Sequence, residues 1–262
     1  MNPKYIDIHS HLNLKEFDED RSEIIQKLKD DNIATITVGV NYESSLFAVS
    51  LAVEHYNLFA SIGIHPSYSN TEDFDHDKMF DLASNNKVVA IGECGLDYFH
   101  DFSIELKEKQ ISLFKKHIEL SIELKLPLMI HARASLGTMD AYEDVLHILE
   151  SYKENNNIHA NFHFFAGDKN IAKKIIEMGY TMSFDGPITF TNDYDEIIKM
   201  TPIELIMAET DSPYAAPEPY RGRRCEPQMV GEIVKKIAKI KEISLDEASS
   251  ILIRNTKRIF DI

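Results

Sequence analysis

The chain is poor in cysteine and has no long apolar run. Its 262 residues include only two cysteines, Cys94 and Cys225, and no tryptophan. This argues against a secreted scaffold built on disulfides. No apolar run approaches the roughly 20 residues that cross a bilayer. The first residues, MNPKYIDIHSH, also lack the basic flank and apolar stretch of a signal peptide. We therefore expect a reduced, cytoplasmic protein with no membrane partner and no obligate protein partner.

Basic residues are also scarce relative to acidic ones. The chain has 28 Lys and Arg against 43 Asp and Glu, a net charge of −15. This charge argues against broad electrostatic attraction to nucleic acid or an anionic membrane. It does not exclude a phosphate substrate, because bound divalent ions invert the local field. No low-complexity segment, tandem repeat or linker divides the sequence, so we expect one domain over residues 1–262.

Short β-branched apolar runs alternate with longer amphipathic stretches. The expected strands are Tyr5–Ile8, Ala34–Val38, Leu58–Ile62, Val88–Ile91, Leu128–Ile130, Ile158–Phe162, Thr181–Phe184 and Leu205–Ala208. The expected helices include Arg21–Asp31, Ser103–Leu124, Ala141–Glu154, Ile171–Met178 (ending at Gly179), Pro227–Lys239 and Leu245–Leu252. This alternation predicts an α/β protein, a single-domain (β/α)8 TIM barrel with extra C-terminal helices. An open doubly wound sheet is the alternative, disfavoured because no glycine-rich dinucleotide loop follows the first strand.

Polar residues follow the expected strands at their carboxyl ends. In a parallel barrel these ends meet on one face, where barrel enzymes build their active sites. Two of them, His9 and His11, are two apart on an extended segment and so face the same side. An isolated pair of this kind can arise by chance, but imidazoles and carboxylates at further strand ends favour a metal site for zinc, manganese, magnesium or a similar ion. The candidate metal ligands are His9, His11, Glu93, His131, His163 and Asp211.

Six ligands are too many for one tetrahedral catalytic ion that keeps an open position. They suit two divalent cations about 3.5–4 Å apart with a carboxylate between them. In barrel order the eighth strand closes against the first, which groups His9 and His11 with Asp211. The fifth and sixth strands supply His131 and His163 to the second ion. The fourth strand then places Glu93 as the bridge.

At these residues the sequence resembles the TatD family of metal-dependent deoxyribonucleases, within the amidohydrolase-like superfamily. The resemblance is collinear over the whole chain, and GECGLDYF and ETDSPY are its most specific motifs. The matching segments are DIHSHL (7–12), GIHP (63–66), GECGLDYF (92–99), HAR (131–133), HFFAG (163–167), ETDSPY (209–214), APEPYRGRRCEP (216–227) and NTKRIF (255–260). The departures, among them Ser135 and Ser67, remove no candidate ligand.

The resemblance implies hydrolysis of phosphodiester bonds in DNA, expected as exonuclease action on single strands or 3′ ends. In this scheme Glu93, Asp211 and His65 are catalytic. His65 is included because it ends the third strand. The candidate substrate contacts are His65, Arg133, Arg221 and Arg223, with Arg224 in the same basic loop.

Other functions remain open at this point. The same metals could hydrolyse D-aminoacyl-tRNA or another ester or amide. Related sites often carry a carboxylated lysine on the fourth strand, and Glu93 at that place favours the nuclease branch. A non-catalytic metal-binding barrel is the alternative from another class.

Overall fold

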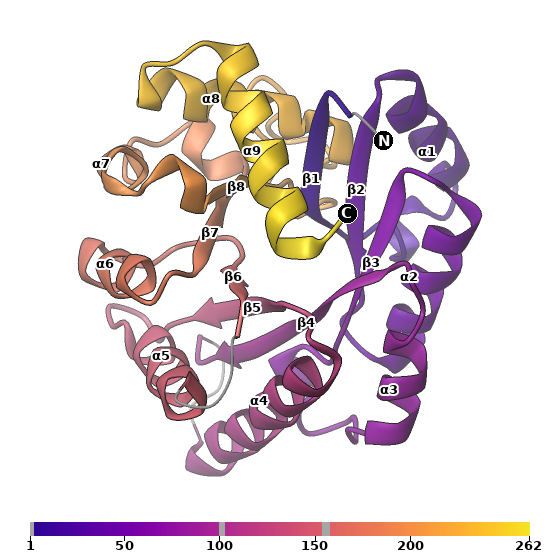
Figure 1. The fold of residues 1–262 in the computed structure, drawn as a ribbon, viewed down its shortest axis with the longest axis vertical. Coiled ribbons are helices and arrows are strands. Elements are labelled where there is room, and N and C mark those ends of the chain that lie inside the picture. The colour runs from indigo at the N-terminus through magenta and orange to yellow at the C-terminus, as the bar shows by residue number, and fades with distance from the viewer. Residues whose placement is uncertain (1–2, 100–102, 154–157) are drawn as a thin grey trace.

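Eight parallel strands surround the centre of the computed structural model (Figure 1), which describes residues 3–99, 103–153 and 158–262. The strands pair in chain order, so each neighbour along the sequence is also the neighbour in the sheet. They are β1 Tyr5–Ser10, β2 Ile33–Val38, β3 Leu58–Ile62, β4 Val88–Asp97, β5 Leu128–Arg133, β6 Ala160–Phe162, β7 Thr181–Phe184 and β8 Ile206–Ala208. The predicted (β/α)8 barrel is therefore confirmed.

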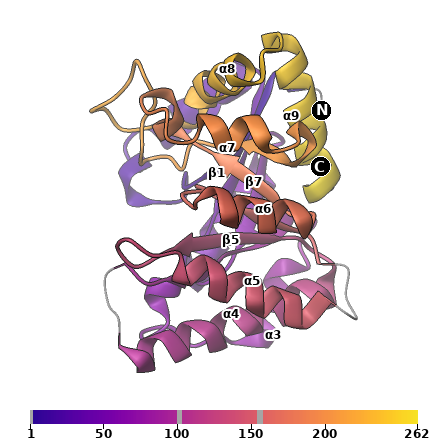
Figure 2. The same ribbon diagram turned by 90° about the vertical axis from the view of Figure 1, so that its left-hand side faces the viewer.

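Helices cover the outside of this barrel (Figures 1 and 2). They are α1 Arg21–Asp30, α2 Tyr42–Glu54, α3 His76–Ala83, α4 Ile104–Leu124, α5 Asp140–Lys153, α6 Lys169–Glu177, α7 Asp195–Met200, α8 Val230–Lys241 and α9 Leu245–Phe260. The predicted helix 141–154 corresponds to α5, except that Glu154 lies outside the described residues. In the described ranges, no helix combines the length and apolarity that crossing a bilayer would require.

Several elements are longer than the sequence predicts, and β4 and α9 extend furthest because a glycine-containing or polar stretch is part of each. Strand β4 runs six residues beyond Ile91 to Asp97. Its Gly92 and Gly95 lie so close to β5 that an added Cβ would be 2.4 and 2.0 Å from backbone oxygens of that strand. Glycine at these two positions lets the strands approach rather than ending β4. Helix α9 passes Leu252 because the buried Asn255 amide bonds backbone carbonyls next to β8.

The barrel closes where β1 meets the segment after β8. The main-chain N–H of His11 donates to the Ser212 carbonyl at 2.8 Å, and the N–H of Asp211 donates to the His9 carbonyl at 2.9 Å. These bonds bring together residues about 200 positions apart in the sequence. They place the Asp211 carboxylate beside the two imidazoles of β1.

Asp7 strengthens the same closure from inside the barrel. Its fully buried carboxylate accepts the main-chain N–H of Thr210 at 2.9 Å and the Thr210 hydroxyl at 2.8 Å. A buried polar group with several bonded partners is costly to move. The spacing of His9 and Asp211 is thereby fixed before any ligand binds.

Candidate metal centre

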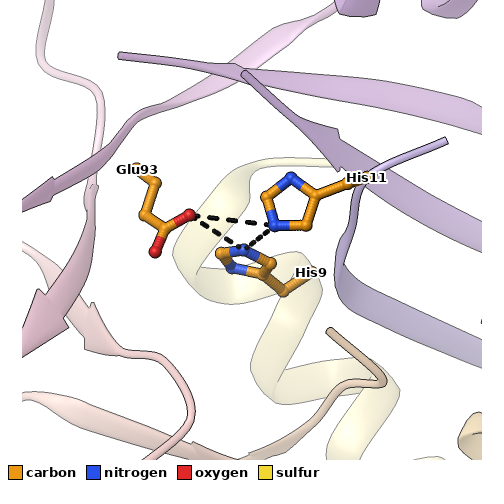
Figure 3. Close-up of side chains that lie close together, drawn as sticks. All are labelled: His9, His11 and Glu93. Carbon is orange, nitrogen blue, oxygen red and sulfur yellow. Dashed lines mark hydrogen bonds and ion pairs between the residues drawn. The ribbon is translucent and has the colours of Figure 1, made fainter. Parts of the chain in front are cut away.

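The six predicted ligands converge at the carboxyl ends of the strands, and all of them except the fully buried His9 line one cavity. His9 and His11 of β1 direct their Nε2 atoms toward each other, 3.2 Å apart, and toward Glu93 (Figure 3). Oε2 of Glu93 lies 3.5 Å from Nε2 of His9 and 3.8 Å from Nε2 of His11. Oδ1 of Asp211 completes this first group at 3.3 Å from Nε2 of His11 and 3.7 Å from Nε2 of His9.

The other carboxylate oxygen of Glu93 faces a second group. Oε1 lies 2.8 Å from Nε2 of His163 and 2.9 Å from Nδ1 of His131. The imidazole of His163 also stacks on that of His9, with centroids 3.9 Å apart, so the two groups adjoin. The two oxygens of one carboxylate thus face different ligand atoms. His163 also lies within reach of His9 and Asp211, so the division between two ions that barrel order predicts stays a prediction.

The spacing of the ligand atoms is suited to divalent metal ions. Four ligands placed tetrahedrally about 2.1 Å from a zinc ion stand roughly 3.4 Å apart. The first group has separations of 3.2 to 3.8 Å between its atoms. Within the described residues, three overlapping sets of three possible ligand atoms lie within 4.8 Å of one another. They are His9, His11 and Glu93, then His9, His163 and Asp211, and finally His65, Glu93 and His131.

On two of the rings, those of His11 and His131, hydrogen bonds on the outer side leave the inner nitrogens as lone-pair donors. Nδ1 of His11 lies 2.9 Å from the Val38 carbonyl, which can only accept, so Nδ1 carries the proton. Nε2 of His131 likewise lies 3.1 Å from a carboxylate oxygen of Asp97. Such outer partners fix the tautomer and ring orientation of metal-binding histidines. The donor set therefore fits a metal without rearrangement of these rings.

Charge balance also fits cation binding. Burial raises the pKa of Glu93, but the imidazoles of His163, His65 and His131 outweigh it and hold that pKa well below its usual range. Burial conversely lowers the pKa of His163, yet Glu93 and Glu209 raise it well above the ordinary value. The positive charge that stabilises Glu93 is carried by protons on imidazoles, first of all on that of His163. Divalent cations would supply the same positive charge in their place.

Asp97 belongs to this centre although the sequence analysis did not single it out. It ends β4, and its second oxygen accepts the main-chain N–H of Phe99 at 3.0 Å. Burial raises the pKa of Asp97, and the bond from His131 lowers it to about 2, so the carboxylate is ionised at neutral pH. The signal that could have identified it is its place four residues after Glu93 on one extended strand, which puts both side chains on the same side.

We predict that Asp97→Ala lowers both metal affinity and kcat/KM by about 10–100-fold, the usual cost of losing an outer partner of a metal-binding histidine. Without the carboxylate, His131 loses the acceptor that orients Nδ1 toward Glu93. Competition against a chromophoric chelator would measure the affinity. Asp97→Asn keeps an acceptor oxygen and should lose less. Equal metal affinity in wild type and Asp97→Ala would contradict the role.

His65 follows β3 and lies beside the second group, with Nε2 3.5 Å from Oε1 of Glu93. Its Nδ1 accepts the main-chain N–H of Ser67 at 3.1 Å. In the neutral ring the proton then resides on Nε2, which faces the cavity. Burial lowers the pKa of His65 to about 3, so the ring is a neutral hydrogen-bond donor near pH 7.

A further histidine, His117 of α4, supports this segment from behind. Its Nε2 accepts the N–H of Ile64 at 2.9 Å, and its Nδ1 bonds the Leu113 carbonyl at 2.9 Å. Acceptance at Nε2 requires a neutral ring, with the single proton on Nδ1. Burial lowers the pKa of His117 to about 4. Its buried position and two main-chain partners indicate a structural role.

The His117 ring predicts a specific acid sensitivity of the fold. A group whose pKa is depressed on folding stabilises the protein above its unfolded pKa, and that stability is lost as pH falls toward the folded value. The difference between 6.5 and about 4 corresponds to ~3 kcal/mol. We expect His117→Gln to be less stable at pH 7 but to lose less stability from pH 6.5 to 4, as measured by urea unfolding. Equal losses in both proteins would contradict this account.

The centre opens into a cavity of about 800 Å³. Its wall includes His65 and Arg133, so two of the predicted substrate contacts lie where a substrate would enter. Arg221 and Arg223 are exposed and are not part of this wall. Arg224, from the same loop, forms ion pairs with Asp20 at 2.5 Å and with Glu226 at 3.2 Å.

A parallel eight-stranded barrel that gathers histidines and carboxylates at the carboxyl ends of its strands defines a metal-dependent hydrolase. Residues 6–261 match the family described as TatD related DNase, and the chain belongs to this family.

Individual relatives agree with this assignment. The chain is 36% identical to the uncharacterized metal-dependent hydrolase YabD of Bacillus subtilis, over 98% of each protein. It is 31% identical to a similarly named hydrolase of Methanocaldococcus jannaschii, over 98% of this chain and 97% of the relative. Among solved structures, the TatD homologue YJJV of Escherichia coli superposes with a TM-score of 0.88 over the full length of both chains, at 22% identity. That likeness concerns the fold.

Proposed function

We propose that the chain hydrolyses phosphodiester bonds in DNA, as an exonuclease, with two divalent cations. The observation that carries this proposal is the position of Glu93 between two groups of ligand atoms at the base of an open cavity. His9, His11 and Asp211 would hold one ion, His131 and His163 the other, and Glu93 both. Two-ion centres of this kind are typical of enzymes that displace groups at phosphorus.

The bound ions would lower the pKa of water toward about 7 and withdraw charge from the phosphoryl oxygens. Asp211 lines the cavity. Burial raises its pKa, but the hydrogen bond from His11 outweighs burial and holds that pKa below the ordinary value. The ionised carboxylate could therefore accept the proton of the attacking water. The Nε2–H of His65 can donate to a phosphate oxygen as negative charge accumulates there. Stabilising charge fits the neutral ring of His65 better than donating a proton to the leaving oxygen.

Arg133 extends the site toward the substrate. Its guanidinium carbon lies 3.8 Å from the centroid of the Phe99 ring, at the cavity wall. A guanidinium held flat on an aromatic ring keeps its N–H edge available for phosphate oxygens. The side chain would bind a phosphate adjoining the one that is cut.

Digestion of end-labelled single- and double-stranded DNA, with metal and with chelator, tests the proposal. We expect metal-dependent release of mononucleotides from single-stranded ends. Parallel assays on D-aminoacyl-tRNA test the ester-hydrolysis alternative. Deacylation without DNA cleavage would replace the proposal by that alternative, and internal fragments from closed circular DNA would contradict exonuclease action.

A further inference from the structure

A stacked pair of exposed side chains lies on the loops after β7 and β8. The guanidinium carbon of Arg221 is 3.9 Å from the centroid of the Phe190 ring. Phe190 is 40% exposed, an unusual degree for a phenylalanine, and Arg221 is exposed too. The orange segment that follows β8 extends beyond the barrel in Figure 2. Both residues therefore belong to the face on which the metal ligands gather.

The two loops that carry this pair are fastened to each other. A Cβ on Gly186 would be 1.7 Å from the carbonyl oxygen of Ala215, so the backbones are in direct contact. The N–H of Glu218 donates to the Thr189 hydroxyl at 2.9 Å. Each contact lies within five residues of Phe190 or seven of Arg221 along the chain. The two loops, which form one support for Phe190 and Arg221, therefore hold the pair in a fixed position.

The support leads directly to the metal cavity. Tyr214, on the same segment as Arg221, lines the cavity, and its ring centroid is 6.3 Å from that of His11. Tyr214 is itself 51% exposed. A strand bound at the metal ligands can therefore pass over Tyr214 toward Phe190 and Arg221.

Charge distinguishes Arg221 from its neighbour Arg224. Arg224 is neutralised by Asp20 and Glu226, whereas Arg221 has no ion pair in the part of the chain that the structure describes. An unpaired arginine in a chain of net charge −15 is complementary to an anion. Its planar N–H edge suits phosphate, and guanidinium and aromatic faces suit stacking with an unpaired base.

We propose that Phe190 and Arg221 form an outer subsite for a single-stranded segment of the nucleic-acid substrate. One unpaired base stacks on the pair, and one backbone phosphate accepts hydrogen bonds from Arg221. The inference rests on the proposed function, because it states where the same substrate continues beyond the metals. Bases in a duplex are stacked and paired already, so the subsite favours single strands.

The test compares two substrates of different length. A single-stranded oligonucleotide of about 12 nucleotides reaches the subsite, whereas bis(4-nitrophenyl) phosphate presents only a phosphodiester to the metals. Phe190→Ala and Arg221→Gln are expected to lower the ratio of kcat/KM for the oligonucleotide to that for the small diester by about tenfold each. Arg221→Lys keeps the positive charge but loses the planar guanidinium group, and it should lower this ratio less.

Tyr56→Ala is the matched control. Tyr56 is 60% exposed and lies 6.0 Å from Nζ of Lys29, but it precedes β3 and so belongs to the opposite face of the barrel. It should leave the ratio unchanged. Equal ratios in wild type and Phe190→Ala, with both substrates cleaved, would overturn the subsite and leave the proposed function standing. If neither substrate is cleaved, the proposed function fails.

Binding measured without turnover keeps the subsite testable in that case. Fluorescence anisotropy of the labelled oligonucleotide in EDTA should give about tenfold weaker binding for Phe190→Ala than for wild type and Tyr56→Ala. Equal affinities of the three proteins would overturn the proposal. The proposal would also be overturned if Phe190→Ala lost the same fraction of its affinity for the single-stranded oligonucleotide and for the corresponding duplex, because stacking requires an unpaired base.

Discussion

Replacing Glu93 by alanine is expected to lower kcat by at least about 1,000-fold, a loss of ~4 kcal/mol in transition-state stabilisation. One oxygen of Glu93 faces His9 and His11, and the other faces His131 and His163. Removing this single carboxylate therefore weakens both metal sites together. Turnover of bis(4-nitrophenyl) phosphate and of single-stranded DNA, with metal content by plasma emission, would measure the effect.

The fold should survive the same substitution. Glu93 contacts imidazoles rather than the apolar core, and these rings can become neutral when the carboxylate is absent. Circular dichroism should show an unchanged spectrum and a cooperative thermal transition. Glu93→Gln keeps the volume of the side chain, so its inactivity would assign the loss to charge. More than about 1% residual kcat in folded Glu93→Ala would refute the bridging role.

The convergence of the ligands could be predicted from sequence because it depends only on strand order. Each ligand follows or ends an apolar run, and parallel strands bring such positions to one face. The division between His9 with Asp211 and His131 with His163 follows from the same order. Both predictions follow from strand order alone and do not depend on side-chain contacts.

What the sequence did not reveal depends on contacts between distant segments. The role of Asp97 requires knowing that β4 continues through Gly92 and Gly95, which were interpreted as the end of a strand. The sequence analysis assigns substrate contacts to Arg221 and Arg223 and places Arg224 in the same basic loop. In the structure Arg224 instead pairs with Asp20, 204 residues away in the chain, and no local pattern predicts that bond.

The outer hydrogen bonds are equally hidden from a pattern of residue types. His65 and His131 look alike in sequence, since each ends a strand on the same face. The main-chain N–H of Ser67 donates a hydrogen bond to Nδ1 of His65, whereas the Asp97 carboxylate accepts one from Nε2 of His131. The first ring therefore presents an N–H to the cavity and the second presents a lone pair. This difference is what separates a hydrogen-bond donor from a metal ligand.

Removal of the metals with a chelator is expected to abolish hydrolysis and lower the melting temperature. Binding to the folded chain alone contributes about 2.7 kcal/mol per site at a free ion concentration of 100 Kd. For a chain of this size each kcal/mol corresponds to ~2–4 °C, so one site contributes roughly 5–10 °C. Calorimetry after dialysis against EDTA, and again after adding zinc, manganese or magnesium, would measure the loss and its recovery.

The increase in melting temperature on metal binding should also depend on pH, and the imidazoles determine the direction of that dependence. Because Glu93 and Glu209 raise the pKa of His163 despite its burial, a cation must displace a proton there. Metal binding therefore strengthens as pH rises, and the increase in melting temperature should be larger at pH 8 than at pH 6. His131→Ala should retain the shift of the first site and lose that of the second. Binding of only one equivalent of metal would contradict the two-ion centre. So would a melting temperature that EDTA leaves unchanged at both pH values.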